Sequence, residues 1–432
     1  MLSVYRNMFR IRDLRNKVLF TLMIFAVYRA GAAIPVPGVD IDAVKQFADQ
    51  AEAAGIVGLL NLFSGGALET FSVFSLGIMP YITSSIIMQL LAVVIPRLQK
   101  LQEEGEAGRK VVTQWTRYVT VILALLQSTG LTFLFHRGTL TGGIDLIPSY
   151  TPGRVLIIVI TLTAGTAFIM WLGELISLRG IGNGMSLIIF VSIVSQLPAQ
   201  FAVLASSAGG YANAKFIGVV LLFLVLTAGI IFVDQGQRRI PIQFSKRVRG
   251  RRMLGGQSTY IPLKVNTAGV IPVIFASSVL YFPALVASSI PADGFFGPIR
   301  RFIDTNLVSG RTWWYVILFG LLIVFFTYFY TAIQFDPARQ SDMIQRQGGF
   351  IPGIRPGSQT THYLEHILAR ITLPGSLFLA SVAVLPSIVA IFYDLSIGFS
   401  GVSILIVTGV SLETMKQIES QLMMRNYEGF LA

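Results

Sequence analysis

Long apolar stretches separated by shorter polar segments are the dominant pattern along this 432-residue chain. A helix that crosses a membrane needs about 20 predominantly apolar residues. The pattern predicts ten such helices, at residues 18–33, 77–95, 118–135, 154–173, 184–199, 216–233, 268–286, 313–331, 371–392 and 401–420. The first contains Arg29, and the last becomes polar after Val410.

Composition agrees with a membrane protein. Hydrophobic residues make up 53% of the chain and charged residues only 12%, whereas soluble domains carry about 25% charged residues. This composition excludes an ordinary cytosolic enzyme, and its high hydrophobicity excludes intrinsic disorder. We therefore expect an all-α integral membrane protein with many spans.

The first apolar stretch also has features of a secretory signal. It follows a basic start and ends at Ala30-Gly31-Ala32-Ala33, which is similar to a cleavage site. Arg29 directly before that site, and Pro35 and Pro37 after it, are against cleavage. We therefore keep the stretch as a span.

The basic residues predict the orientation. Ten spans with a cytoplasmic N-terminus place 25 of the 33 Lys and Arg residues inside and 8 outside. Basic residues collect in cytoplasmic loops, so both termini are expected in the cytoplasm. The net charge of +12 therefore needs no nucleic-acid partner to explain it.

Two of the predicted cytoplasmic loops are long. Residues 234–264 contain two β-favouring runs, at 239–244 and 258–263, which predict a β-hairpin. A basic tip lies between them, formed by Lys246, Arg247, Arg249, Arg251 and Arg252. Residues 332–370 are polar, with turn signals at 348–349 and 352–357.

Few residues are placed for catalysis or ion coupling. The charged residues Arg29, Glu174 and Asp394 lie at span edges rather than at mid-membrane. An ion-coupled carrier or an intramembrane protease needs such groups at mid-membrane, so both functions are disfavoured. The chain has no Cys and no phosphate-binding loop of the Walker type. His362-Tyr363-Leu364-Glu365-His366 matches a zinc-protease pattern, but a catalytic zinc normally takes three protein ligands and no third is evident nearby. The alternative is a chance match on a polar helix.

Several features suit a gated passage. Residues 60–73 are weakly amphipathic and contain Gly65-Gly66, which permits a short, closely packed half-helix, with an ordinary loop as the alternative. Isoleucines recur at helical spacing, as a hydrophobic constriction requires, although Ile is also a common lipid-facing residue. Four polar side chains within spans predict interhelical hydrogen bonds: Gln89, Gln127, Ser277 and Ser278. These bonds either hold the helices together permanently or lie at a helix contact that opens.

The sequence resembles the SecY family, the large subunits of bacterial protein-conducting channels, over essentially its whole length. The stretches that carry the resemblance are residues 63–68, 76–82, 180–184, 255–258, 262–278 and 349–357. Their common order and spacing make a chance match implausible.

The resemblance implies ten helices in two inverted halves, residues 1–199 and 200–432, around an hourglass pore with a cytosolic β-hairpin. The family's pore ring falls on Ile82, Ile86, Met185, Ile189, Ile274 and Ile406, which we call the ring residues. Met185 departs from the β-branched residue expected there, and its flexibility permits looser packing. The plug falls on about residues 60–73, the plug segment, with Asn61, Leu62, Phe63, Ser64, Gly65, Gly66, Ala67 and Leu68 at its centre.

The resemblance also implies a lateral gate and partners. Spans two and three face spans seven and eight at the gate, which places Gln89, Gln127, Ser277 and Ser278 (the gate residues) at or near it. The hairpin-tip residues and Arg355 are expected to dock the SecA motor ATPase or the ribosome. The implied small subunits are SecE and SecG, and the implied substrates are preproteins with signal sequences. The implied location is the bacterial plasma membrane, where membrane lipids surround the channel. No cofactor and no covalent step are implied for this subunit.

Three functions are therefore compared below: a protein-translocation channel, a small-molecule secondary transporter, and a membrane-embedded enzyme that uses His362 and His366.

Overall fold

The structure is a computed structural model. It describes residues 11–44, 46, 63–138, 145–147, 150–211, 213–244, 247–249, 252–254, 258–289, 297–303, 305–306, 312–393 and 400–428.

Each of the ten predicted spans overlaps one long helix. The ranges 18–33, 77–95 and 268–286 extend up to three residues beyond their helices, and the helix that contains 184–199 ends nine residues after this range. The helices are α2 (Arg12–Ala32), α5 (Met79–Val94), α7 (Glu106–His136), α8 (Pro152–Arg179), α9 (Gly184–Ala208), α10 (Ala214–Gln235), α11 (Ile271–Ser289), α13 (Trp313–Gln334), α15 (Ser358–Tyr393) and α16 (Gly401–Glu428). Three shorter helices are α6 (Pro96–Glu103), α12 (Gly297–Ile303) and α14 (Pro337–Arg346).

Six helical segments of the described chain are by themselves long and apolar enough to cross a membrane. They contain α7, α8, α9, α10, α13 and α15. A seventh results if α5 and α6, which meet at a bend of 108°, count as one broken span. The bend follows from Pro96, because Ile95 before it adopts the extended backbone that a following proline favours.

Local sequence explains where several helices begin and end. The side chains of Asn183 and Asn213 accept hydrogen bonds from backbone N–H groups in the first turns of α9 and α10, as N-caps do. Gly209 ends α9 in the left-handed conformation. This helix therefore continues through Pro198 to Ala208, beyond the predicted end of the fifth span and beyond the expected boundary between the halves at residue 199.

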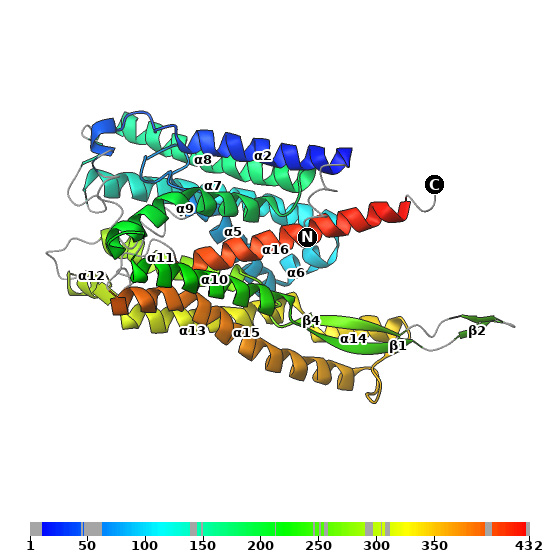
Figure 1. Cartoon of the computed structure of the whole chain (residues 1–432). Coiled ribbons are helices and arrows are strands. Elements are labelled where there is room, and N and C mark those ends of the chain that lie inside the picture. Colours follow the sequence, from blue (N-terminus) through cyan, green and yellow to red (C-terminus); the bar gives the residue numbers. More distant parts are fainter. Residues whose placement is uncertain are drawn as a thin grey trace.

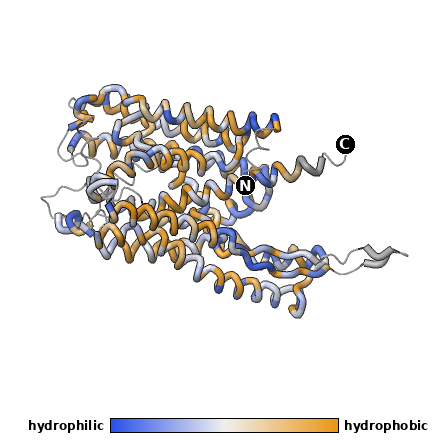
Figure 2. The backbone as a smooth tube through the Cα atoms, in the orientation of Figure 1, coloured by the Kyte–Doolittle hydropathy of each residue, from blue (hydrophilic) through white to orange (hydrophobic). Residues whose placement is uncertain are grey.

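The helices form one elongated bundle (Figure 1). The group of α2, α7 and α8 lies on one side, the group of α10, α11, α13 and α15 on the other, and α9 and α16 run between them. Apolar residues cover most of the bundle, and polar residues gather at its ends and on the sheet (Figure 2).

The predicted β-hairpin is confirmed. Strands β1 (Gln237–Phe244) and β4 (Ser258–Lys264) pair antiparallel, with Ile240 opposite Ile261. Beyond them, β2 (Arg247–Arg249) and β3 (Arg252–Leu254) form a second two-stranded sheet. Strand β5 (Gly349–Phe350) adds to the free edge of β1, giving the order β4-β1-β5. This sheet and α14 extend beyond one end of the bundle (Figure 1).

The packing between helices is uneven. α11 packs extensively against α13, and α5 packs extensively against α7. The contacts of α11 with α5 and with α7 are slight. The contact of α11 with α5 and α7 is therefore weaker than the contacts of α11 with α13 and of α5 with α7.

Candidate functional site

The six ring residues come together from four helices. Ile82 and Ile86 lie one turn apart on α5, and Met185 and Ile189 lie one turn apart on α9, so each pair shares one helix face. All six belong to the largest hydrophobic cluster of the protein. Ile86, Ile189 and Ile406 are buried, and the other three are half-buried against them.

The packing around Met185 explains how this flexible side chain is accommodated. Gly173 on α8 lies against the Met185 thioether, and a Cβ at that position would collide with the sulfur. The absence of a side chain on α8 therefore makes room for the longer, unbranched residue.

A cavity of about 280 Å³ opens onto this ring. Ile189, Ile274 and Ile406 form part of its wall. The rest of the wall mixes polar residues, such as Asn266, Asp234 and Lys416, with apolar ones, such as Val270, Ile271 and Val410. Among these polar residues, Lys416 Nζ and Asp234 Oδ2 are 2.7 Å apart and join α16 to α10. This cavity, the vestibule, therefore has polar and apolar walls and borders three of the ring residues.

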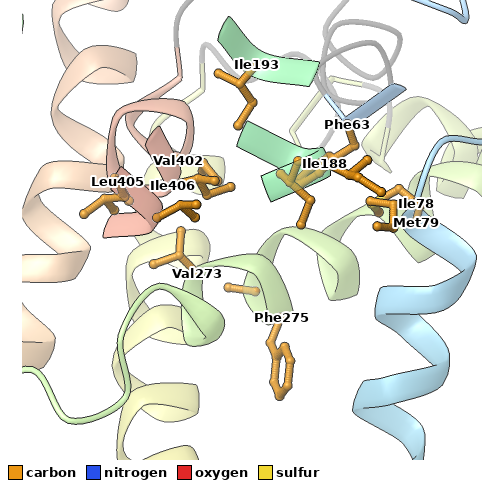
Figure 3. Packing of buried hydrophobic residues seen from close by; sticks show 14 of the residues in the cluster. Phe63, Ile78, Met79, Ile188, Ile193, Val273, Phe275, Val402, Leu405 and Ile406 are labelled. Atoms are coloured by element: carbon orange, nitrogen blue, oxygen red, sulfur yellow. The ribbon is translucent and has the colours of Figure 1, made fainter. Parts of the chain in front are cut away.

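The described part of the plug segment is buried within the bundle. Phe63, Ser64, Ala67 and Leu68 are each at most 1% exposed. Phe63 and Ala67 belong to the same cluster as the ring residues, and Figure 3 shows Phe63 near Ile78, Met79 and Ile188. On the other side of this view, Val402, Leu405 and Ile406 of α16 lie near Val273 of α11 (Figure 3). Asn61 and Leu62 lie outside the described residues.

The backbone of the plug segment is a series of turns after Ser64, so the half-helix expected from the sequence is wrong for residues 65–73. Gly65 and Gly66 have φ angles of +68° and +87°, which disfavour a continuing right-handed helix and favour glycine. Both glycines also lie against α9. A Cβ on Gly65 would be 3.0 Å from Ser192 Cα, and one on Gly66 would collide with the Gln196 amide.

Side chains of α2 bind the backbone of the plug segment, and serines of α9 bind these α2 side chains. The Tyr28 hydroxyl donates to the Ser64 carbonyl at 3.1 Å and lies 2.6 Å from Ser192 Oγ. The Arg29 guanidinium donates to the Gly65 carbonyl at 2.7 Å and to Ser195 Oγ at 3.4 Å. The sequence singled out Arg29 only as an unusual charge in a span, and it gave no signal for Tyr28, Ser192 or Ser195.

The predicted interhelical hydrogen bonds of the gate residues are not found among the described residues. Gln89 Nε2 donates to Ser85 Oγ one turn earlier on α5, at 3.3 Å. Ser277 and Ser278 donate to the carbonyls of Val273 and Ile274 on their own helix. Such bonds to the residue four positions earlier are the usual alternative for serine in a helix. Gln127 is half-buried on α7.

Other polar contacts join neighbouring helices instead. Ser84 Oγ donates to the Thr116 carbonyl at 2.6 Å, between α5 and α7. Arg117 Nε and Glu174 Oε1 are 2.7 Å apart, between α7 and α8. These two contacts join α5, α7 and α8 to one another, and neither involves α11.

The expected docking residues that the structure describes lie in the turn after β5 and in the separate β2–β3 sheet. Arg355 is exposed on the turn between β5 and α15, and its carbonyl accepts a hydrogen bond from Thr360 Oγ1 at 3.0 Å. Because β5 pairs with β1, this turn and the base of the hairpin belong to one unit. Arg247, Arg249 and Arg252 lie on β2 and β3, of which the structure describes the backbone, and Lys246 and Arg251 lie outside the described residues.

The two histidines of the zinc-like pattern are exposed near the start of α15. His362 Nδ1 lies 3.2 Å from Glu365 Oε2, so Glu365 is paired with a histidine one turn away. Among the described residues, no group of three or more His, Cys, Asp or Glu side chains is arranged to hold a metal ion.

Comparisons with known proteins agree with this architecture. The family model described as SecY matches residues 72–415. The chain is similar to the protein translocase subunit SecY of Streptomyces galbus, at 51% identity over 441 residues that cover all of both chains. Its fold resembles that of a channel solved to study how the plug domain of SecY stabilises the closed state, with a TM-score of 0.61, 18% identity and coverage of 94% and 91%. It also resembles Sec61 in a canine ribosome-channel complex, with a TM-score of 0.56, 16% identity and coverage of 94% and 91%.

Proposed function

Because this chain belongs to the SecY family, we propose that it forms the pore of a protein-conducting channel, which moves unfolded preproteins across a membrane and inserts membrane proteins into it. The observation that carries the proposal is that the six ring residues belong to one apolar cluster, three of them bordering the vestibule. The plug segment packs into the same cluster.

An apolar constriction suits a channel for polypeptides. A ring of aliphatic side chains excludes water and hydrated ions when it is closed. When a chain passes, the same side chains offer it no lasting hydrogen bonds, so polar and apolar segments slide through with similar ease. Met185 keeps this chemistry because its side chain is apolar and adaptable.

Opening requires the plug segment to leave and the weak helix contact to part. A signal sequence offers an apolar helix that replaces the slight contacts of α11 with α5 and α7. The gate residues lie on these three helices, and because Gln89, Ser277 and Ser278 bond within their own helices, separation costs none of those bonds. A membrane segment leaves sideways through the same line into lipid.

The chain is proposed to be a passive channel, without a catalytic step or a cofactor of its own. Its energy then comes from the SecA ATPase or the ribosome. The exposed Arg355 on a sheet that extends beyond the bundle supports a docking role for this end, together with the basic hairpin tip. The fold shared with a ribosome-bound channel favours the ribosome as one partner. RNA attracts basic loops.

The proposed setting is the bacterial plasma membrane, with both termini in the cytoplasm. The distribution of basic residues supports this orientation. SecE and SecG are the proposed small subunits. Two five-helix halves of inverted orientation remain the proposed organisation, and the helix bounds move the connection between them to residues 209–213.

The test is reconstitution in proteoliposomes with the small subunits, SecA, ATP and a signal-bearing precursor. The proposal predicts precursor that becomes protected from added protease only when ATP and an intact signal are both present. A precursor without its signal is the matched control. Absence of protection, with the partners shown to be bound, would contradict the channel function and favour a small-molecule transporter.

A further inference from the structure

The plug segment is held through its backbone as well as by its apolar side chains. Two consecutive residues of α2, Tyr28 and Arg29, donate to two consecutive carbonyls, those of Ser64 and Gly65. Two serines of α9, Ser192 and Ser195, complete the arrangement. These contacts join three segments that lie far apart in the sequence.

We propose that Tyr28 and Arg29 form a clasp on the plug segment that sets how easily the channel opens, and thereby how strong a signal sequence must be. This inference rests on the proposed channel function. It assigns a role to the one charged side chain that the sequence places within the first predicted span.

The two halves of the clasp differ in strength. The Arg29 bond is charge-assisted and short, at 2.7 Å, whereas the Tyr28 bond joins neutral groups at 3.1 Å. Hydrogen bonds from charged donors are the stronger class. Arg29 is exposed, so its guanidinium is not enclosed by protein once the Gly65 carbonyl leaves.

Release leaves no buried hydroxyl without a partner. Tyr28 is 1% exposed, and an unsatisfied hydroxyl at such a position is strongly unfavourable. Its second partner, Ser192 Oγ at 2.6 Å, lies on α9 and does not move with the plug segment. When Tyr28 then donates to Ser192 Oγ, the serine hydroxyl can donate to the Ile188 carbonyl of its own helix, 2.9 Å away. The clasp can therefore open and close repeatedly.

The close approach that the clasp requires explains the paired glycines. The Gly65 carbonyl reaches Arg29 only because the turn passes directly against Ser192 on α9. A Cβ on Gly65 would also lie 3.2 Å from the Tyr28 hydroxyl oxygen. Because the clasp recognises backbone carbonyls, it tolerates changes of the other plug side chains.

The clasp can be tested by the accessibility of a buried thiol. The chain has no cysteine, so Ser64→Cys introduces a single reporter at a site that is 1% exposed. The full chain is reconstituted with its small subunits, and the rate of labelling by a membrane-impermeant maleimide is measured in the resting state. Labelling requires the plug segment to leave its site.

We expect Arg29→Gln to raise the labelling rate roughly tenfold and Tyr28→Phe to raise it a few-fold. Arg29→Lys, which keeps the charge but not the guanidinium, is expected to lie between the parent and Arg29→Gln. Lys215→Gln, at the start of α10, is the matched control for a lost cation and leaves the rate unchanged. Tyr28→Phe keeps the ring stacked on Phe74 at 5.7 Å, so it reports on the hydroxyl rather than on packing.

Equal labelling rates in the parent, Arg29→Gln and Tyr28→Phe would overturn the clasp. The second measurement is transport of a precursor with a shortened apolar signal, which Arg29→Gln is expected to improve. If the parent transports no precursor, the channel function fails while the labelling rates still decide the clasp. If transport is normal and labelling is unaffected, the clasp alone fails.

Discussion

At the scale of single residues, the centre of the site depends on apolar side chains and its periphery on backbone groups. The ring residues contribute only aliphatic and thioether atoms, whereas the plug segment is held through the carbonyls of Ser64 and Gly65. Substitutions in the ring should therefore alter the seal, and substitutions beside the plug segment should alter its position.

Replacing Ile406 by Asn is expected to weaken the seal. Ile406 is 1% exposed and borders the vestibule, so an amide there brings water into an apolar constriction. We expect the resting ion conductance of reconstituted channels to rise about tenfold, because burying a polar group without a partner costs about 1–3 kcal/mol in the closed state. Ile406→Leu is the matched control. Unchanged ion tightness and signal stringency in Ile406→Asn would argue against the ring assignment.

Replacing Gly66 by Ala is expected to displace the plug segment. The φ of +87° disfavours any residue with a Cβ by about 1–2 kcal/mol, and the new Cβ also pushes aside the amide end of the flexible Gln196 side chain. Thermal unfolding and resting conductance measure the effect: the midpoint falls and the conductance rises. Gly130→Ala on α7 is the control, because its Cβ meets open space. Equal behaviour of the two variants would refute the close approach to α9.

Single residues also show where sequence reasoning succeeds and fails. Aliphatic residues at helical spacing, such as Ile82 and Ile86, share a face by geometry alone, so their grouping was predictable. The partners of Tyr28 were not, because Ser192 lies 164 positions away and no local pattern relates the two. The interhelical bonds expected for Ser277 and Ser278 failed because a serine in a helix has an acceptor within reach on its own helix.

At the scale of elements, the sheet that extends from the bundle is the distinctive unit. The base of the hairpin and the Arg355 turn are connected through the pairing of β1 with β5. Ile240, Leu263, Ile351, Leu364 and Ile367 form a separate hydrophobic cluster that fixes this unit to α15. A partner that binds the unit is therefore coupled rigidly to a helix of the bundle.

Arg355→Glu is expected to impair transport driven by SecA while leaving membrane insertion of the channel intact. The exposed guanidinium makes no interhelical contact that the structure describes, so its reversal changes the docking surface rather than the fold. The measurement compares ATP-dependent precursor protection with the amount of channel in the membrane. Arg370→Glu, at an exposed position farther along α15, is the control. Normal transport by Arg355→Glu would remove the docking role.

The ion pair between α10 and α16 is expected to add modestly to stability. Lys416 and Asp234 are partly exposed, and such pairs contribute up to about 1 kcal/mol. Asp234→Asn should lower the thermal midpoint slightly, and the exchanged pair Asp234→Lys with Lys416→Asp should restore it at low salt. Failure of the exchanged pair to restore the midpoint would show that the two charges do not act together.

The elements were largely predictable because membrane helices and hairpins have strong local patterns. The apolar stretches identified the ten longer helices but not α6, α12 or α14, and the alternating runs identified β1 and β4. The end of α9 was missed because Pro198 suggests a helix end, although a proline within a span is tolerated. Strand β5 has only two residues, and its pairing with Gln243 and Phe244 is long-range, so the sequence contains no signal for it.

At the scale of the whole molecule, the arrangement gives one passage with two exits. In the proposed channel, the vestibule borders the ring, the plug segment packs into the same cluster, and the slight contacts of α11 with α5 and α7 form the line proposed to open towards lipid. The same closed seal therefore serves both transport across the membrane and insertion into it.

The most direct test of this account is whether a translocating chain passes through the ring. A single cysteine is introduced at Ile406 of the cysteine-free chain, and a precursor with one cysteine is arrested during transport. The account predicts a disulfide between the two, and none from Leu221→Cys, which is 60% exposed on α10. Precursor that is transported and protease-protected, yet never cross-links to Ile406→Cys at any point of arrest, would contradict the central claim.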